Sequence, residues 1–450
     1  MDINAIALLI SQTIWGWPLL ALFLIMGLIV TVATRFVQIR HLPTALKAVF
    51  APSREEMTVA GAAPLSPFQA FLNSLGTATG NGCIAGMATA IYCGGPGSAF
   101  WLLIAGFLGM ALRYAEVYLG TCFVGETAPN GAKGGPMLYL SKLPGGTILP
   151  YCYAFMVLLY GLASGTAMQA NAIGLGVART WGIDKLFIAI AIALFIGYAL
   201  LGGAKRILAI SDRLTPFKVA VFLISSLLVL GYNYAGIIDA LRLIVMSAFA
   251  LPAVAGGVVG YTVQQAMRNG FTRSLNANEA GLGVASLFFG ATGSKHPVQD
   301  SILSMVSAFI TNYCVCFLVA LVIIASGVWN NGLQSTELVI SAFETFFGAY
   351  AGYVVTFCAA SFGLGCMIST SFLARECFLF LTRGRFVYLF YLLYVVVAFL
   401  GTQARVDIVW NTNDIINASL LCINCAAILY FLPRIARGIA NFNNTVAHKQ

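Results

Sequence analysis

The stretch Gly76-Thr77-Ala78-Thr79-Gly80-Asn81-Gly82-Cys83-Ile84-Ala85-Gly86 lies within an apolar segment, Pro67 to Cys93, that carries no charged residue. This segment is long enough to cross a bilayer as a helix. Its glycines at 76, 80, 82 and 86 disfavour a continuous helix, because each glycine costs up to about 1 kcal/mol relative to alanine. Non-helical backbone persists at membrane depth only where it lines a cavity or is buried in protein. The stretch therefore predicts a broken spanning helix, as in carriers that hold a small solute and its coupling ion. The alternative is close helix packing through small residues.

The composition of the chain indicates a polytopic helical membrane protein. Of its 450 residues, 60% are hydrophobic and 9% are charged, and the mean hydropathy is +0.90. A soluble domain carries about a quarter charged residues, and barrel strands would appear as short alternating segments instead of long apolar runs. We predict an all-α fold with eleven transmembrane helices, near residues 14–34, 68–92, 97–123, 149–177, 186–203, 216–235, 244–267, 298–328, 346–374, 386–402 and 415–432.

The positions of the basic residues predict how the chain crosses the membrane. With the N-terminus outside and the spans alternating, 20 of the 24 Lys and Arg residues fall on or near one side, including Lys218, Arg268 and Arg273. The exceptions are Arg179, Lys185, Arg242 and Arg405. Because short loops rich in Lys and Arg stay in the cytoplasm, we predict a cytoplasmic C-terminus in a plasma membrane of the bacterial type. The net charge of +9 then reflects orientation and requires no nucleic-acid partner.

The predicted spans divide into two matched sets. The first span stands apart with its cytoplasmic linker (residues 1–66), the other ten form two sets of five (67–240 and 241–435), and a cytoplasmic tail follows (436–450). Each set opens with a glycine-interrupted segment, which in the second set is Ala255-Gly256-Gly257-Val258-Val259-Gly260. Since five is odd, the two sets must have inverted topology. Matched broken segments in inverted halves indicate a transport site at the middle of the membrane.

Side chains that enzymes and metal sites use are sparse in this sequence. The eleven cysteines lie almost entirely within predicted spans, where cysteine behaves as a small apolar residue. The three histidines, His41, His296 and His448, all fall on the predicted cytoplasmic side. These positions form no metal-ligand or triad arrangement, so we predict that the protein is no enzyme and has no resident cofactor.

Four polar or charged residues inside the predicted spans each have two interpretations. Arg113 and Glu116, three residues apart, can pair on one helix face and serve as a gate or as a structural tie. Gln169 and Asn171 are amides deep in the fourth span. Because a buried amide needs partners, each of them either ties helices together or faces the solute.

Glu279 lies in the longest non-apolar stretch, Asn269 to Val298, which the predicted topology places in the cytoplasm. It is either a coupling carboxylate or part of a loop helix whose N-cap is Asn276 or Asn278. We favour the structural role, because a cytoplasmic loop lies far from the middle of the membrane.

Several longer motifs carry a family resemblance. They include Gly82-x-Ile84-Ala85-Gly86-Met87-Ala88-Thr89-Ala90-Ile91, Gly94-Gly95-Pro96-Gly97, Met168-Gln169-Ala170-Asn171 and Asn278-Glu279-Ala280-Gly281-Leu282-Gly283. Together these motifs resemble the alanine or glycine:cation symporter family, strongly over residues 30 to 310. The resemblance implies the five-helix inverted-repeat fold of the bacterial leucine transporter class with one extra N-terminal span. It also implies sodium-driven uptake of alanine or glycine, of either hand.

The chain departs from the family pattern at two places. Where the pattern reads Gly-Thr-Gly-Asn-Ile-Ala-Gly, this chain has Cys83, so a soft thiol replaces a hard amide oxygen suited to a cation. Asn81 lies two residues away and could supply that oxygen instead. In the ninth span, the family's Thr-Thr pair followed by Gly-Trp is replaced by Gly365-Cys366 and Ser369-Thr370. The missing Trp implies a roomier pocket or an altered selectivity.

A zwitterionic amino acid needs hydrogen-bond donors for its carboxylate and acceptors for its ammonium. The outer half of a broken helix begins with free amides at its positive dipole end, so we assign the carboxylate to the backbone amides of Asn81, Gly82 and Cys83. The groups assigned to the ammonium are the carbonyls of Ala255, Gly256 and Gly257 and the side chain of Gln169.

The coupling ion is assigned to a site between the two halves. Its predicted ligands are the carbonyls of Gly76 and Thr79 and the hydroxyls of Ser369 and Thr370, a hard-oxygen set suited to sodium. We therefore predict a secondary active transporter that couples sodium to inward movement of alanine or glycine by alternating access. The alternatives are a proton-coupled or uncoupled carrier of small amino acids and, less favoured, a channel, which should line its pore with repeated polar rings.

Overall fold

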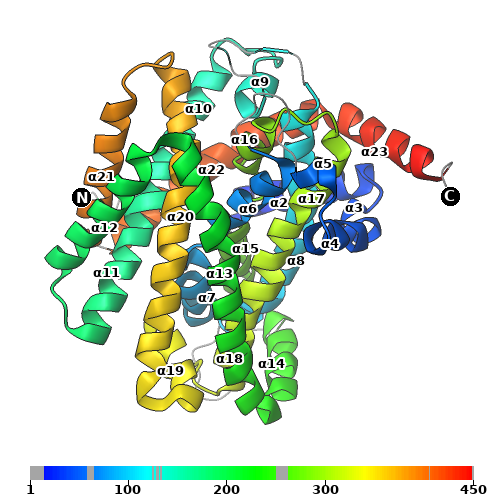
Figure 1. Cartoon of the computed structure of the whole chain (residues 1–450). Helices are drawn as coiled ribbons and strands as arrows, with labels where there is room; N and C mark the ends of the chain where they lie inside the picture. Colours follow the sequence, from blue (N-terminus) through cyan, green and yellow to red (C-terminus); the bar gives the residue numbers. More distant parts are fainter. Residues whose placement is uncertain are drawn as a thin grey trace.

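The computed structural model describes residues 15–57, 65–123, 126–127, 131, 134–249, 262–404 and 406–447. Within these residues the chain is helical and has no strand, which confirms the all-α class (Figure 1). Among them six helices are long and apolar enough to cross a membrane, and shorter apolar helices accompany them. The six are Gly97–Thr121, Leu149–Trp181, Gly203–Tyr232, Pro297–Ala325, Ser335–Leu381 and Thr412–Tyr430; the shorter ones are Trp17–Ala33, Lys185–Leu201 and Val387–Gln403.

Helices of the N-terminal half overlap the spans predicted there. They are α2 (Trp17–Ala33), α6 (Pro67–Ala78), α7 (Asn81–Gly94), α8 (Gly97–Thr121), α10 (Leu149–Leu162), α11 (Met168–Trp181), α12 (Lys185–Leu201) and α13 (Gly203–Tyr232). A π-helical segment, η2 (Ala163–Ala167), joins α10 to α11. Short helices α3 (Val37–Arg40), α4 (Leu42–Phe50), α5 (Arg54–Met57) and α9 (Pro136–Leu140) connect them. Helix α13 begins well before the predicted residue 216, so Lys218 lies inside a helix and not at its edge.

The break predicted in the glycine-rich span is present at Thr79 and Gly80. Helix α6 begins at a capping box between Ser66 and Gln69 and ends at Ala78. Gly80 is extended, with φ −101° and ψ −172°, and α7 begins at the next residue. The two halves of this span are therefore separate helices with free ends that face each other. We call Thr79 and Gly80 the first break.

Parts of two helices cover the predicted seventh span, 244–267, for which a glycine interruption was expected. Helix α14 (Ile237–Phe249) ends before the glycine run, and α15 (Val263–Asn278) begins after it, at a capping box between Thr262 and Gln265. The three residues assigned to the ammonium here, Ala255, Gly256 and Gly257, lie outside the described residues. Much of the predicted cytoplasmic stretch after Asn269 is instead helix α15. Its polar sequence hid it from a hydropathy argument, because the helix is surrounded by protein and not by lipid.

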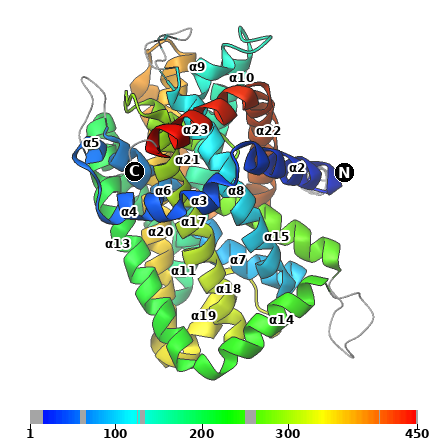
Figure 2. The same cartoon turned by 90° about the vertical axis from the view of Figure 1, so that its right-hand side faces the viewer.

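A second interruption follows α15. Residues 279–284 are non-helical and buried, and the short helix α16 (Ala285–Gly290) follows them. We call residues 279–284 the second break. Helix α7 packs against α15 and α6 packs against α16, so two interrupted helices lie side by side in the interior (Figures 1 and 2).

The remaining helices surround this pair. They are α17 (Pro297–Phe309), the π-helical η4 (Ile310–Cys316), α18 (Phe317–Ala325), α19 (Ser335–Phe347), α20 (Ala351–Leu381), α21 (Val387–Gln403), α22 (Val406–Tyr430) and α23 (Leu432–Ala447). They overlap the predicted spans 298–328, 346–374, 386–402 and 415–432. Helix α8 packs against α15, α16 and α17, whereas α13 and α20 pack against each other and against α6. The first break therefore lies beside α13 and α20, and the second break lies beside α8.

Candidate functional site

The backbone groups freed at the first break meet side chains from other helices. The amide of Asn81 donates to Oε1 of Gln169 at 2.9 Å. The Cys83 amide donates to the carbonyl of Gly80 at 3.1 Å, and the Cys83 thiol donates to the carbonyl of Ala78 at 3.3 Å. The amide of Gly82 belongs to the same helix start, where N–H groups have no intrahelical acceptor. The three residues assigned to the carboxylate thus share one helix N-terminus, and two of their amides have acceptors from this chain.

Gln169 reaches the first break from α11, directly after the π-helical segment η2. Its side chain is buried, and its Nε2 donates to the carbonyl of Ser164 at 3.1 Å. A Cβ on Gly80 would lie 2.9 Å from Nε2 of Gln169, which is too close for a real contact. The close approach explains why glycine is needed at position 80. Asn171, in contrast, donates to the carbonyls of Gly401 and Ala404, at 3.2 and 2.7 Å, and ties α11 to the end of α21.

The side chain of Asn81 has no hydrogen-bond partner in the described part of the chain. Both Oδ1 and Nδ2 are buried and unpaired, and the residue is 1% exposed. A Cβ on Gly363 would lie 2.7 Å from Nδ2, so the amide points toward α20. Buried polar groups in folded proteins are nearly always paired, and an unpaired one costs about 1–3 kcal/mol. An orphaned amide at a helix break is therefore a candidate contact for a polar solute.

Lys218 lies at the end of α6, across the first break from Gln169. From the sequence it was placed among the basic residues on or near the cytoplasmic side. The residue is fully buried in α13. Its Nζ donates to the carbonyls of Gly76 and Thr79, at 2.9 and 2.7 Å, and to that of Phe362 in α20 at 3.5 Å. The available signal was its place just inside a predicted span, where an ionisable residue is by default a functional candidate.

The two hydroxyls assigned to sodium lie on α20 near the same carbonyls. Ser369 Oγ is 2.6 Å from Ser211 Oγ and donates to the carbonyl of Gly365 at 3.0 Å. Thr370 Oγ1 is 3.7 Å from the Cys366 thiol, which donates to the carbonyl of Thr77 at 3.2 Å. Three of the four predicted ligands, Gly76, Thr79 and Ser369, thus lie where α6 meets α20, whereas Thr370 lies against Gly161 and Gly165. Two of them, the carbonyls of Gly76 and Thr79, already accept from the Lys218 ammonium.

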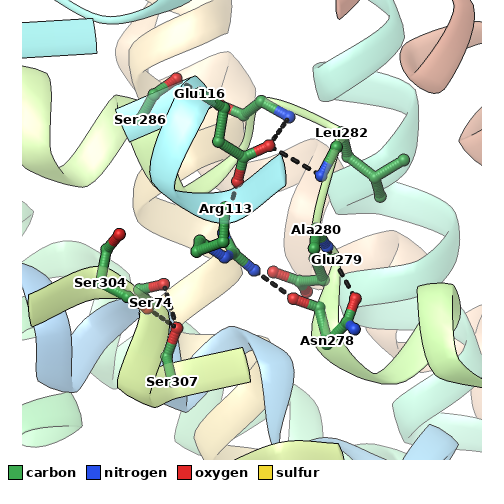
Figure 3. A network of polar contacts seen from close by, with 12 residues as sticks. Ser74, Arg113, Glu116, Asn278, Glu279, Ala280, Leu282, Ser286, Ser304 and Ser307 are labelled. Carbon is green, nitrogen blue, oxygen red and sulfur yellow. Dashed lines mark hydrogen bonds and ion pairs between the residues drawn. The ribbon is translucent and has the colours of Figure 1, made fainter. Parts of the chain in front are cut away.

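The second break is held by a buried ion pair on α8 (Figure 3). Arg113 and Glu116 pair at 2.8 Å with both side chains inaccessible. Glu116 Oε2 accepts from the amides of Gly281 and Gly283, each at 2.9 Å, and Arg113 donates to the carbonyl of Asn278. Gly281 and Gly283 have φ of +86° and +82°, a conformation that glycine adopts without strain. Of the two interpretations of this pair, the geometry therefore supports the structural tie.

Glu279 is not an element of a cytoplasmic loop helix. It ends α15 in the left-handed conformation, is 2% exposed, and accepts from Thr77 Oγ1 at 2.8 Å and from the Tyr160 hydroxyl. Asn276 and Asn278 lie at the end of α15 and not at a helix start. The expected N-cap role of Asn276 or Asn278 is therefore wrong, and Glu279 is instead the C-cap of α15. Its partner Thr77 belongs to the last turn of α6, two residues before the first break. Glu279 connects the two breaks.

Paired interrupted helices inside a set of membrane-length helices are an architecture of membrane transporters. A crystal structure of a manganese transporter from Eremococcus coleocola has a similar fold: the TM-score is 0.53, the identity is 12%, and the match covers 83% of this chain and 80% of that one.

The comparison with protein families is more specific. The family model described as the sodium:alanine symporter family matches residues 1–450. The chain is 33% identical over 434 residues to an uncharacterized transporter from Haemophilus influenzae, covering 95% of this chain and 94% of that one. It is 30% identical over 451 residues to the sodium/alanine symporter AgcS from Methanococcus maripaludis, covering 98% of each. The protein belongs to the sodium:alanine symporter family, which confirms the resemblance, and it is a multi-pass membrane transporter.

Proposed function

We propose that this protein carries a small neutral amino acid, alanine or glycine of either hand, into the cell by alternating access. The unpaired amide of Asn81 is the observation that carries this proposal. It lies beside the helix N-terminus at Asn81 and Gly82, which suits a carboxylate, and beside Gln169, an amide with oxygen for an ammonium.

The residues around the Asn81 amide favour a small solute, because they include glycines in close contact with their neighbours. Gly80 touches Gln169 and Cys366, and Gly363 lies against Asn81 and Ile173, so glycine backbone lines two sides. Gly82 lies opposite the carbonyl of Asn276, which would be 3.6 Å from a Cβ on Gly82. Specificity for the smallest amino acids follows if a longer side chain must displace these close contacts. The relative AgcS is named for alanine, which supports the same substrate class.

The topology belongs to the same proposal. We propose eleven spans, an outside N-terminus and a cytoplasmic C-terminus, with inverted five-helix sets in residues 67–240 and 241–435. The opening helix of the second set is then α15–α16, which replaces the predicted span 244–267. The pairing of α7 with α15 and of α6 with α16 supports two related broken helices. A reporter fused after Gln450 should read cytoplasmic, and a reading from the outside would contradict this orientation.

Sodium is the coupling ion that the family name supports, with Gly76, Thr79, Ser369 and Thr370 as its proposed ligands. The second candidate is a proton, and one observation favours it: the ammonium of Lys218 already lies on two of these four residues.

Counterflow with purified protein in proteoliposomes tests the substrate class. Vesicles loaded with unlabelled alanine or glycine should draw in labelled alanine or glycine, whereas vesicles loaded with leucine, glutamate or lysine should not. Asn81→Ala should abolish this exchange while membrane insertion and yield stay normal. Exchange of the large or charged amino acids, or normal exchange by Asn81→Ala, would contradict the proposal.

A further inference from the structure

Lys218 places an ammonium group at the first break. Its side chain is fully buried, and its Nζ lies between the carbonyls of Gly76 and Thr79 on one side and that of Phe362 on the other. The ion pairs found in the described residues do not include it. Its charge is therefore met by backbone carbonyl oxygens, and these come from two helices, α6 and α20.

This arrangement is the ligand set of a small hard cation. Such a cation prefers oxygen ligands, and carriers with broken helices offer it carbonyls from the unwound backbone. The carbonyls of Gly76 and Thr79 are three residues apart at the end of α6, and the carbonyl of Phe362 faces them from α20. An ion at this position would connect one helix of each half. Lys218 makes that connection without an ion.

Residues around Nζ leave room for an ammonium and offer few hard side-chain oxygens. A Cβ on Gly365 would lie 2.8 Å from Nζ, so a glycine there admits the lysine. The next residue, Cys366, presents a soft thiol, and the nearby hydroxyl of Ser369 is engaged with Ser211 and Gly365. Cys366 is thus a poor ligand for sodium and Ser369 is occupied, whereas the buried hydroxyl of Thr215, beside Gly76, has no hydrogen-bond partner in the described residues.

We propose that the ammonium of Lys218 takes the place of the coupling cation at this position, and that the proton on its Nζ is the ion coupled to transport there. The proposal rests on the amino-acid transport proposed above and specifies its coupling ion. In the connected state the ammonium bridges α6 and α20. When α6 moves away on the cytoplasmic side, Nζ loses its acceptors and passes its proton to cytoplasmic water. The amine takes a proton from outside water when the site reopens outward, so one proton enters per cycle.

Three other titratable groups lie near Lys218 and interact with its charge. They are Cys83 on α7, Cys366 on α20 and Glu279 at the end of α15. Glu279 is held by Thr77 and Tyr160, and the thiols donate to carbonyls of Ala78 and Thr77. None of the three replaces the carbonyl oxygens as a direct partner of Nζ.

The wild-type protein gives the first test. Proteoliposomes free of sodium, alkaline inside, should accumulate labelled alanine or glycine above the outside concentration, and a protonophore should abolish the accumulation. Adding sodium at a fixed pH gradient should leave the initial rate unchanged. Uptake that requires sodium and ignores the pH gradient would overturn the proposal.

Substitutions at Lys218 give the second test. Lys218→Met should lower gradient-driven accumulation about tenfold or more, a usual size for coupling between linked sites, while exchange without a gradient continues. Lys205→Met is the matched control, since Lys205 is exposed in the first turn of the same helix and should leave accumulation unchanged. Unchanged proton-driven accumulation by Lys218→Met would overturn the proposal.

A double variant keeps the proposal testable if Lys218→Met does not fold. Lys218→Ala/Cys366→Ser empties the space between the carbonyls and adds a hard hydroxyl, so its uptake should become dependent on sodium. A folded double variant without sodium stimulation counts against the proposal, and if neither variant folds the wild-type measurement decides. Failure of the wild type to exchange any amino acid would instead contradict the transport function itself.

Discussion

The two interrupted helices are broken in different ways. The first break is two residues long, and long side chains from neighbouring helices meet its backbone groups: the amine of Lys218 and the amide of Gln169. The second break is six residues long, and a buried carboxylate, Glu116, fixes its amides with help from Arg113 and Asn424. One break has an unpaired amide and a charge without a carboxylate partner, and the other is bound on several sides. We therefore expect the first break to exchange partners during transport and the second to serve as a rigid support.

The largest expected effect tests the rigid break. Arg113→Met leaves Glu116 buried without its ion-pair partner, and removing one member of a buried pair costs about 3–5 kcal/mol. Thermal unfolding of the purified protein should therefore shift strongly downward. Arg179→Met is the matched control, because the pair of Arg179 with Glu337 is exposed and such pairs contribute about 0–1 kcal/mol. Equal shifts in the two variants would mean that the ion pair on α8 does not anchor the second break.

The next effect separates the glycines of the first break. Gly80→Ala places a Cβ 2.9 Å from Nε2 of Gln169 and should displace that side chain. Leaving a buried polar group unpaired costs about 1–3 kcal/mol, which corresponds to a loss of affinity of about 5- to 150-fold. Gly82→Ala meets only an ordinary contact at 3.6 Å and should bind alanine or glycine nearly as well as the wild type. Titration calorimetry measures both, and a larger loss at Gly82 would reverse this ranking.

A smaller effect distinguishes the two amides of α11. Gln169→Ala removes the acceptor of the Asn81 amide and should weaken solute binding about tenfold, the equivalent of one lost hydrogen bond. Asn171→Ala cuts a tie to the end of α21 and should lower the free energy of unfolding by about 1 kcal/mol without changing affinity. Measuring affinity and thermal stability for both variants resolves the two roles. Loss of stability with normal affinity in Gln169→Ala would make that residue a helix tie as well.

The smallest effect concerns Cys83. Its thiol donates to the carbonyl of Ala78 and not to the carbonyls that hold Lys218. Cys83→Ser keeps a donor at this place, so the dependence of uptake on sodium and on pH should stay that of the wild type. The proteoliposomes described above measure this dependence. A changed ion dependence in Cys83→Ser would mean that Cys83 influences the site of Lys218 although the two side chains bind different carbonyls.

The sequence predicted the first break correctly because its cause is local. Glycine density in a span without charge disfavours a helix wherever the span lies, and the break falls within the quoted stretch, at Thr79 and Gly80. The interruption predicted at residues 255–260 lies outside the described residues. The break at 279–284 was not predicted, because α15 is too polar to register as a membrane helix. Several of its polar side chains, such as Thr272, Ser274 and Asn278, are buried in protein. A hydropathy argument assumes instead that a span faces lipid.

The functional residues also differ in how far local sequence predicts them. The positions of Asn81 and Gln169 were predicted, since both belong to motifs within spans, but their contact depends on how α11 packs against the first break. Lys218 was assigned to the cytoplasmic side because the start of α13 was placed too late. Glu279 was assigned to a loop because α15 was missed. Packing removes both charged residues from water, which no local property of the sequence records.

The π-helical segment η2 sets the direction in which Gln169 points. A π-helical turn accommodates one residue more than an α-helical turn, so residues 163–167 hold the surplus residue of the run that continues into α11. If the same residues were wound as a regular α-helix, the extra residue would rotate everything after it by about 100°. Gln169 would then face away from the first break although no side chain of the site had changed. The rotational phase of α11, and with it the orientation of its part of the site, thus depends on the π-helical winding of η2.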